Sequence, residues 1–135
     1  MATLLIDATI DGHGELIARR LGADYWREMR DHVGIQLLHF EQIGLDRAAK
    51  DDVVWRLCQE REFYLLTDNR NHESEDSLEA TIRREGTPQT VPVFTLGNAD
   101  RLYQSATYLD KGVEKLLDCL LDEVSYRGAG RVFLP

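Results

Sequence analysis

Aspartates stand at four places from which a fold can bring them together. Asp7 and Asp68 each directly follow a short apolar run, Asp51 opens an amphipathic segment, and Asp76 precedes another. Carboxylates that converge on one edge repel one another unless a cation neutralises them, and their oxygen ligands suit Mg²⁺ or Mn²⁺. A bound divalent ion lowers the pKa of a water molecule and neutralises charge on a reacting phosphate. The four aspartates therefore indicate metal-assisted hydrolysis of a phosphodiester.

Each aspartate taken singly also has an ordinary structural role. Asp51, Asp52 and Asp76 suit a helix cap or a first helical turn, where a carboxylate interacts favourably with the helix dipole. An Asp after a strand commonly forms a turn. The joint placement is what favours a site, because ligands of parallel α/β sheets bind at the carboxyl ends of the strands, where Asp7 and Asp68 are expected.

Apolar runs alternate with amphipathic segments along the chain. The expected strands cover residues 3–6, 35–40, 64–67 and 91–96, and the expected helices cover residues 15–21, 50–63, 77–84 and 109–124. The glycines of Gly12-His13-Gly14 are expected to form a turn before the first helix. This order predicts an α/β fold with a mainly parallel sheet of about four strands flanked by helices.

The domain is expected to span residues 1–125, followed by a C-terminal tail at 126–135. The middle of the tail contains two glycines and its end is apolar. The sequence leaves open whether this tail packs on its own domain, on a partner or on nothing. The last expected helix carries a wide apolar stripe, which fits either core packing or the seam of a homodimer.

Composition limits the classes of function. The chain has 135 residues with 24 acidic and 16 basic side chains, a formal charge of −8. Such a balance excludes a basic nucleic-acid coat protein, which needs cations to replace the counterions of phosphates. Cys58 and Cys119 lie too far apart for a redox pair or a zinc knuckle. The start of the chain predicts neither a signal peptide nor a membrane span, so a cytoplasmic location is expected.

Several of these segments together resemble a known family of nucleases. They are Asp7 after its strand, the helix start Lys50-Asp51-Asp52-Val53-Val54-Trp55, and the segment 63–71 that ends the next strand. Across residues 3 to 96 the chain is similar to PIN-like nucleases, particularly the short PIN-like proteins of bacterial toxin–antitoxin modules. The resemblance implies that Asp7, Asp51 and the Asp68-Asn69 pair bind Mg²⁺ or Mn²⁺, that RNA is the substrate, and that a small antitoxin protein is a partner.

The chain departs from the family pattern after Thr67. The family places acids two and four residues after this threonine, whereas this chain has Asn69 and Asn71 there and an acid at Asp68 instead. An amide oxygen coordinates a metal but brings no charge. Three alternatives follow: Asp68 replaces the missing acid through a local shift, Asp76 supplies the charge, or the site is weak or inactive. The last alternative predicts a PIN-like protein-interaction module rather than an enzyme.

Other polar side chains are candidate ligands for the substrate. Arg70 is placed to clamp a phosphate with two hydrogen bonds, with Asn69 and Lys50 beside it. The alternative is a solvated loop arginine that pairs with Glu73 or Glu75. A receiver-type phosphoacceptor is disfavoured, since the first strand is not followed by two adjacent acids and the later Thr95-Leu96-Gly97 segment has no lysine.

Two histidines, His13 and His72, fit either proton transfer or a solvated surface position.

Overall fold

A five-stranded sheet organises the computed structural model, which describes residues 1–70 and 74–135. The predictions that involve Asn71, His72 and Glu73 lie outside the described residues. The strands are β1 (Ala2–Ile6), β2 (Ile35–His39), β3 (Tyr64–Thr67), β4 (Val93–Leu96) and β5 (Arg131–Leu134). The helices are α1 (Asp11–Leu21), α2 (Arg27–Val33), α3 (Asp51–Arg61), α4 (Leu78–Glu85), α5 (Arg101–Gln104), α6 (Ala106–Leu121) and α7 (Glu123–Tyr126). Short 3₁₀ turns occupy Ala8–Ile10 (η1), Asp24–Trp26 (η2) and Phe40–Ile43 (η3).

The strand order is β2-β1-β3-β4-β5, and every pair of neighbours is parallel. The prediction of an α/β fold with a parallel sheet is confirmed, but the sheet has five strands rather than about four. The additional strand is β5, which lies in the segment expected as a tail and pairs with β4 from Val93–Arg131 to Leu96–Leu134. Gly128 and Gly130 have φ of 81° and 77°, which lets the chain turn into this strand.

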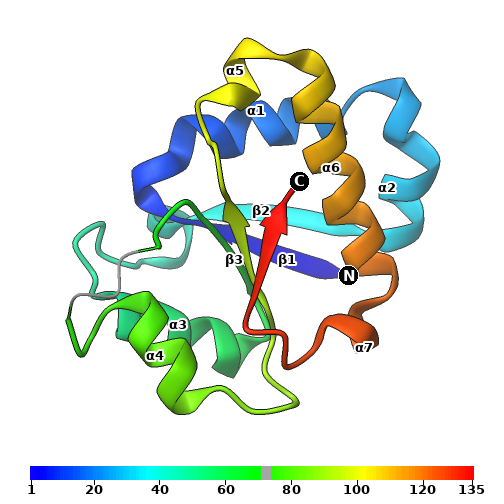
Figure 1. Cartoon of the computed structure of the whole chain (residues 1–135). Coiled ribbons are helices and arrows are strands. Elements are labelled where there is room, and N and C mark those ends of the chain that lie inside the picture. Colours follow the sequence, from blue (N-terminus) through cyan, green and yellow to red (C-terminus); the bar gives the residue numbers. More distant parts are fainter. Residues whose placement is uncertain (71–73) are drawn as a thin grey trace.

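Helices cover both faces of the sheet (Figure 1). One face packs against α1, α2 and α6, and the other against α3 and α4. Alternate residues of each strand supply the two cores, so that Leu4 and Ile6 belong to the first and Leu5 to the second. Most of the apolar stripe of α6 packs into the first core. Its buried residues there are Leu109, Val113, Leu116, Leu117 and Leu120.

The first helix begins earlier than the glycines predicted. Gly12 and Gly14 lie inside α1, which starts at Asp11, so the expected turn at Gly12-His13-Gly14 is wrong. A Cβ at position 14 would lie 2.6 Å from the side chain of Ile6, which is too close. Glycine at this position therefore allows α1 to approach β1 closely. The helix therefore packs directly onto β1, which it follows after the single η1 turn.

Parallel connections bring several chain segments to one edge. Asp7 follows the carboxyl end of β1, Asp68 follows that of β3, and α3 begins after the connection that leaves β2. None of the helices within residues 1–70 and 74–135 is long and apolar enough to cross a membrane.

Candidate functional site

A cavity of about 360 Å³ lies at the carboxyl edge of β1 and β3. Its polar lining consists of Asp7, Thr9, Arg47, Asp51, Asp68 and Asn69. Apolar side chains including Phe40, Val54 and Leu65 complete it. We call this the acid cavity. The structure thus brings the three aspartates predicted as metal ligands to one concave surface, although they come from three separate parts of the chain.

Asp7 is held by hydrogen bonds from two directions. One carboxylate oxygen accepts from the backbone N–H of Thr9 at 3.2 Å, which caps the η1 turn. The other accepts from the hydroxyl of Thr67 at 2.6 Å. The backbone N–H of Asp7 donates to the carbonyl oxygen of Leu66 at 2.9 Å. Asp7 is therefore fixed to the end of β3 by both its side chain and its main chain.

Asp51 is held between helix α4 and the segment after β3. Its Oδ2 accepts from the side-chain amide of Asn69 at 2.9 Å and from the backbone N–H of Leu78 at 3.1 Å. The hydroxyl of Thr67 in turn accepts from the backbone N–H of Asn69 at 3.0 Å. A continuous chain of hydrogen bonds therefore runs from Asp7 through Thr67 and Asn69 to Asp51.

Asn69 changes the electrostatics at the position where the family pattern has an acid. A carboxylate there would face the negative charge of Asp51 at hydrogen-bond distance, whereas the amide donates to it. The repulsion between Asp51 and residue 69 is replaced by an attraction, with no ion needed to relieve it. Asp68 is exposed and lines the same cavity.

The donor chemistry of the acid cavity fits a hard cation, since carboxylate and amide oxygens are the ligands that Mg²⁺ and Mn²⁺ prefer. Among the described residues, however, no group of three or more His, Cys, Asp or Glu side chains is arranged to hold a metal ion. The metal at Asp7, Asp51 and Asp68 stays a prediction.

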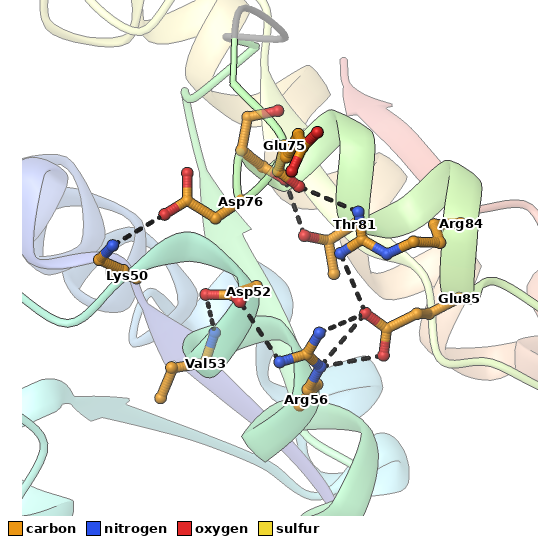
Figure 2. Close-up of polar contacts among 10 residues, drawn as sticks. Lys50, Asp52, Val53, Arg56, Glu75, Asp76, Thr81, Arg84 and Glu85 are labelled. Atoms are coloured by element: carbon orange, nitrogen blue, oxygen red, sulfur yellow. Dashed lines mark hydrogen bonds and ion pairs between the residues drawn. The ribbon is translucent and has the colours of Figure 1, made fainter.

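Lys50 and Asp76 pair with each other at 3.1 Å across the starts of α3 and α4 (Figure 2). The hydrogen bonds from Lys50 and Ser74 hold the pKa of the Asp76 carboxyl below its ordinary value, and Asp76 raises the pKa of the Lys50 ammonium. Neither residue is part of the lining of the acid cavity. The cap expected at Asp76 falls one residue later, on Ser77, whose hydroxyl accepts from the backbone N–H of Ala80 at 3.2 Å.

A cluster of ion pairs and hydrogen bonds joins the middle of α3 to the C-terminal end of α4 (Figure 2). Arg56 of α3 donates to Glu85 of α4 at 2.7 and 2.9 Å and to Asp52 at 3.3 Å. Arg84 donates to the carbonyl oxygen of Glu75 at 3.0 Å and contacts Glu85 at 3.3 Å. At the opposite end of α4, the backbone N–H of Leu78 donates to Asp51, so the two helices are joined at both ends of α4.

Arg70 lies outside the acid cavity. It lines a second cavity of about 340 Å³ together with Glu79, Arg83, Arg131 and Phe133. No ion pair within residues 1–70 and 74–135 involves Arg70, so the expected pairing with Glu75 is absent there. The pairing with Glu73 lies outside the described residues. We call this second site the arginine cavity.

Arg47 is the residue of the acid cavity that the sequence did not reveal. It donates to Asp11 at 2.6 Å and to the carbonyl oxygen of Ala8 at 2.9 Å. It belongs to the connection between β2 and α3, where no periodic pattern of apolar residues predicts which way its side chain points. Only the path of that connection brings its guanidinium to the rim.

Asp11, the partner of Arg47, is also hydrogen-bonded to His39. His39 contacts Asp11 through Nδ1 at 2.8 Å and Glu15 through Nε2. The hydrogen bond to Asp11 raises the pKa of the His39 imidazole, against the opposing effect of burial and with help from Glu15. Burial opposes ionisation of Asp11, but hydrogen bonds from Arg47 and His39 outweigh it and lower the pKa of that carboxyl.

His13 is remote from this arrangement. It lies in α1, where its ring packs edge-on against Tyr103 with centroids 4.8 Å apart, and its Nε2 is 3.6 Å from Asp100. It lines neither the acid cavity nor the arginine cavity.

The fold and the acid cavity define an α/β domain with a parallel five-stranded sheet and an acid-lined cavity at the carboxyl edge. Comparison of the chain with protein-family models, with curated proteins and with solved structures gave no match.

Proposed function

We propose that this protein is a metal-dependent ribonuclease of PIN-like type, which hydrolyses phosphodiester bonds. The observation that carries the proposal is that Asp7, Asp51 and Asp68 line one cavity at the carboxyl edge of a parallel sheet. That edge is where ligands bind in folds of this kind. The resemblance of residues 3 to 96 to PIN-like nucleases supplies the reaction type.

The residues of the acid cavity have separate roles in this proposal. Asp7 and Asp51 are the oriented ligands, since hydrogen bonds fix both carboxylates before any ion binds. Asp68 adds a third charge at the solvent side. A bound Mg²⁺ or Mn²⁺ would activate water and neutralise charge on the phosphate. Arg47 presents a guanidinium at the rim, where it binds a phosphate oxygen of the RNA.

Net charge is compatible with this substrate. The chain carries −8 overall, so attraction for RNA has to come from local cations. Arg47 in the acid cavity and Lys50 at the start of α3 are the nearby cations, and each is paired with an aspartate, Asp11 and Asp76 respectively. The divalent ion is the other source of positive charge.

Two protein partners belong to the same proposal. One is a small antitoxin protein, as in the modules that the chain resembles, and the other is a second copy docking through the last helices. Leu121 and Val124 are the apolar side chains of this region that remain exposed, and a homodimer would use them. A cytoplasmic location fits these partners.

A catalytically weak or inactive PIN-like interaction module is the second candidate. It is favoured by one observation, the hydrogen bond from the Asn69 amide to Oδ2 of Asp51, which places a neutral donor on that carboxylate where the PIN-like pattern has an acid. The two candidates differ in metal binding and in cleavage, and both properties are measurable.

The test combines cleavage of fluorescent single-stranded RNA in Mn²⁺ with calorimetry of Mn²⁺ binding. We expect Asp7→Asn and Asp51→Asn to lower the cleavage rate by at least about 100-fold, because loss of a ligand should cost at least as much as loss of its supporting partners. Asp118→Asn, an exposed change on α6, is the control and should leave both properties unchanged. Wild-type protein that neither cleaves RNA nor binds Mn²⁺ at millimolar concentration would refute the nuclease proposal and favour the interaction module.

A further inference from the structure

The arginine cavity has an aromatic side chain at its edge. Phe133 is the third residue of β5, and its neighbours Val132 and Leu134 point into the core with 8% and 2% exposure. Phe133 points to the opposite face and is 45% exposed. β5 is the edge strand of the sheet, beside β4 (Figure 1), and nearly half of the Phe133 side chain is open to solvent. A flat aromatic surface is therefore available to solvent.

Charge in the arginine cavity is opposite to that of the whole chain. Three guanidiniums, those of Arg70, Arg83 and Arg131, face a single carboxylate, that of Glu79. Glu79 is engaged mainly by Arg131, at 2.8 Å, and lies 3.5 Å from Arg83. Arg83 is 74% exposed. Two positive charges are thus left for a ligand in a protein whose formal charge is −8.

Arg131 joins this cavity to the acid cavity. Its guanidinium donates to the carbonyl oxygen of Asn69 at 2.8 Å, to the hydroxyl of Thr95 at 2.8 Å and to Glu79. The side chain of the same Asn69 donates to Asp51 in the acid cavity. Asn69 is therefore the single residue through which Arg131, in the lining of the arginine cavity, is hydrogen-bonded to Asp51, in the lining of the acid cavity.

We infer that the arginine cavity binds an unpaired nucleotide of an RNA strand, with its base stacked on Phe133 and its phosphate on Arg70 and Arg83. The inference rests on the proposed function, since the acid cavity would hold the neighbouring phosphate of the same strand. Stacking on aromatic side chains together with arginine contacts to phosphate is how proteins bind single strands without reading their sequence. A duplex does not offer this contact, because its bases are stacked on each other.

We expect a nucleotide rather than an acidic peptide because the arginine cavity offers both an aromatic ring and guanidinium groups. An acidic peptide would use the guanidiniums and gain nothing from an aromatic face. The position of Phe133 beside Arg70, Arg83 and Arg131 matches a ligand that carries a ring and an anion together.

The experiment measures binding without cleavage. Fluorescence anisotropy in EDTA compares a labelled single-stranded RNA of about twelve nucleotides, which spans both cavities at the site sizes of single-strand binders, with a duplex of the same sequence. We expect Phe133→Leu to weaken binding of the single strand about fivefold or more, the loss typical of one stacked base. Phe133→Tyr keeps the ring and should restore wild-type affinity. Binding of the duplex should be weaker and insensitive to both changes.

The arginine contribution is separated by its salt dependence. Arg83→Gln should weaken binding and reduce the slope of log affinity against log salt by about 0.7, the value for one phosphate contact with a single strand. Arg19→Gln, an exposed arginine on α1, is the matched control and should change neither quantity. Melting temperatures near that of the wild type verify that each variant is folded.

Two results would overturn the inference. One is equal affinity of wild type and Phe133→Leu for the single strand. The other is a glutamate peptide that binds the wild type, loses affinity in Arg83→Gln and keeps it in Phe133→Leu, which would assign the cavity to an acidic peptide. The binding assay contains no metal and measures no cleavage, so it is independent of the nuclease test. Wild-type protein that does not cleave RNA in Mn²⁺ would refute the nuclease proposal, whereas loss of the Phe133 effect on RNA binding would refute this inference.

Discussion

The acid cavity and the arginine cavity are linked by the hydrogen bond from Arg131 to Asn69, but their charged side chains are fixed by different partners. In the acid cavity, neutral donors such as the Thr67 hydroxyl and the Leu78 backbone N–H fix the carboxylates. In the arginine cavity, a carboxylate and neutral acceptors fix the guanidinium of Arg131. Neutral donors orient the carboxylates of the acid cavity without cancelling their charge, whereas the arginine cavity stays positive because three arginines face the single carboxylate of Glu79. This is the pattern expected where a metal and a phosphate chain are bound side by side.

Removing Arg131 should disturb both cavities and have the largest effect. Arg131→Met removes the donors to Asn69, Thr95 and Glu79 and leaves these acceptors in a partly buried site. We expect the free energy of unfolding to fall by about 2 to 3 kcal/mol, below the range for a fully buried pair because Glu79 is 25% exposed. Urea denaturation measures the loss, and both RNA cleavage and RNA binding should weaken.

The control is Arg83→Met, which removes an exposed partner of the same carboxylate. An exposed ion pair contributes little, so the loss should stay below about 0.5 kcal/mol. Equal losses for the two variants would show that the contacts of Arg131 with Asn69, Thr95 and Glu79 stabilise the fold no more than an exposed ion pair does.

Two matched threonines allow the cavities to be separated. Thr67 of β3 and Thr95 of β4 are register partners and both are fully buried, but the first serves Asp7 and Asn69 and the second serves Arg131. Thr67→Val should cost about 1 to 2 kcal/mol of stability, since it removes the hydroxyl that donates to Asp7 and accepts from the backbone N–H of Asn69. It should slow cleavage while leaving RNA binding in EDTA unchanged.

Thr95→Val should show the reverse preference. It removes one acceptor of Arg131 and leaves the hydrogen bonds of Asp7 and Asp51 in place. RNA binding should weaken more than cleavage. If both variants changed the two measurements in the same proportion, the cavities would act as one site.

The sequence predicted the acid cavity better than the arginine cavity for a physical reason. Asp7 and Asp68 follow apolar runs that pair inside the sheet, so the fold class alone placed them at one edge. Arg131 and Phe133 belong to a four-residue strand that follows two glycines. Four residues are too few for the alternation of apolar and polar side chains to predict whether the segment joins the sheet. Arg47 depends on the path of a connection, which no local pattern determines.

The smallest effect is expected at His39, which supports only the Arg47 side of the acid cavity. The raised pKa of His39 means that its protonated form stabilises the folded chain below its ordinary pKa of 6.5, and that this stability is lost as the pH rises through the raised value. The lowered pKa of Asp11 sets the acidic limit. The stability that its ionised carboxylate contributes is lost as the pH falls through a value below 3.8. The contact is therefore complete between these limits.

Thermal unfolding of wild type and His39→Gln across this range tests the contact. The wild type should exceed the variant by about 0.5 to 1 kcal/mol at pH 5.5, a modest value because Glu15 is largely exposed and solvent screens the charges. The difference should vanish at alkaline pH, where the imidazole is neutral. RNA binding at the arginine cavity should not differ between the two proteins at either pH, because Arg47 keeps its hydrogen bonds to Asp11 and Ala8, and neither contact reaches Asn69. A pH-dependent change in that binding would mean that the acid cavity and the arginine cavity communicate through more than Asn69.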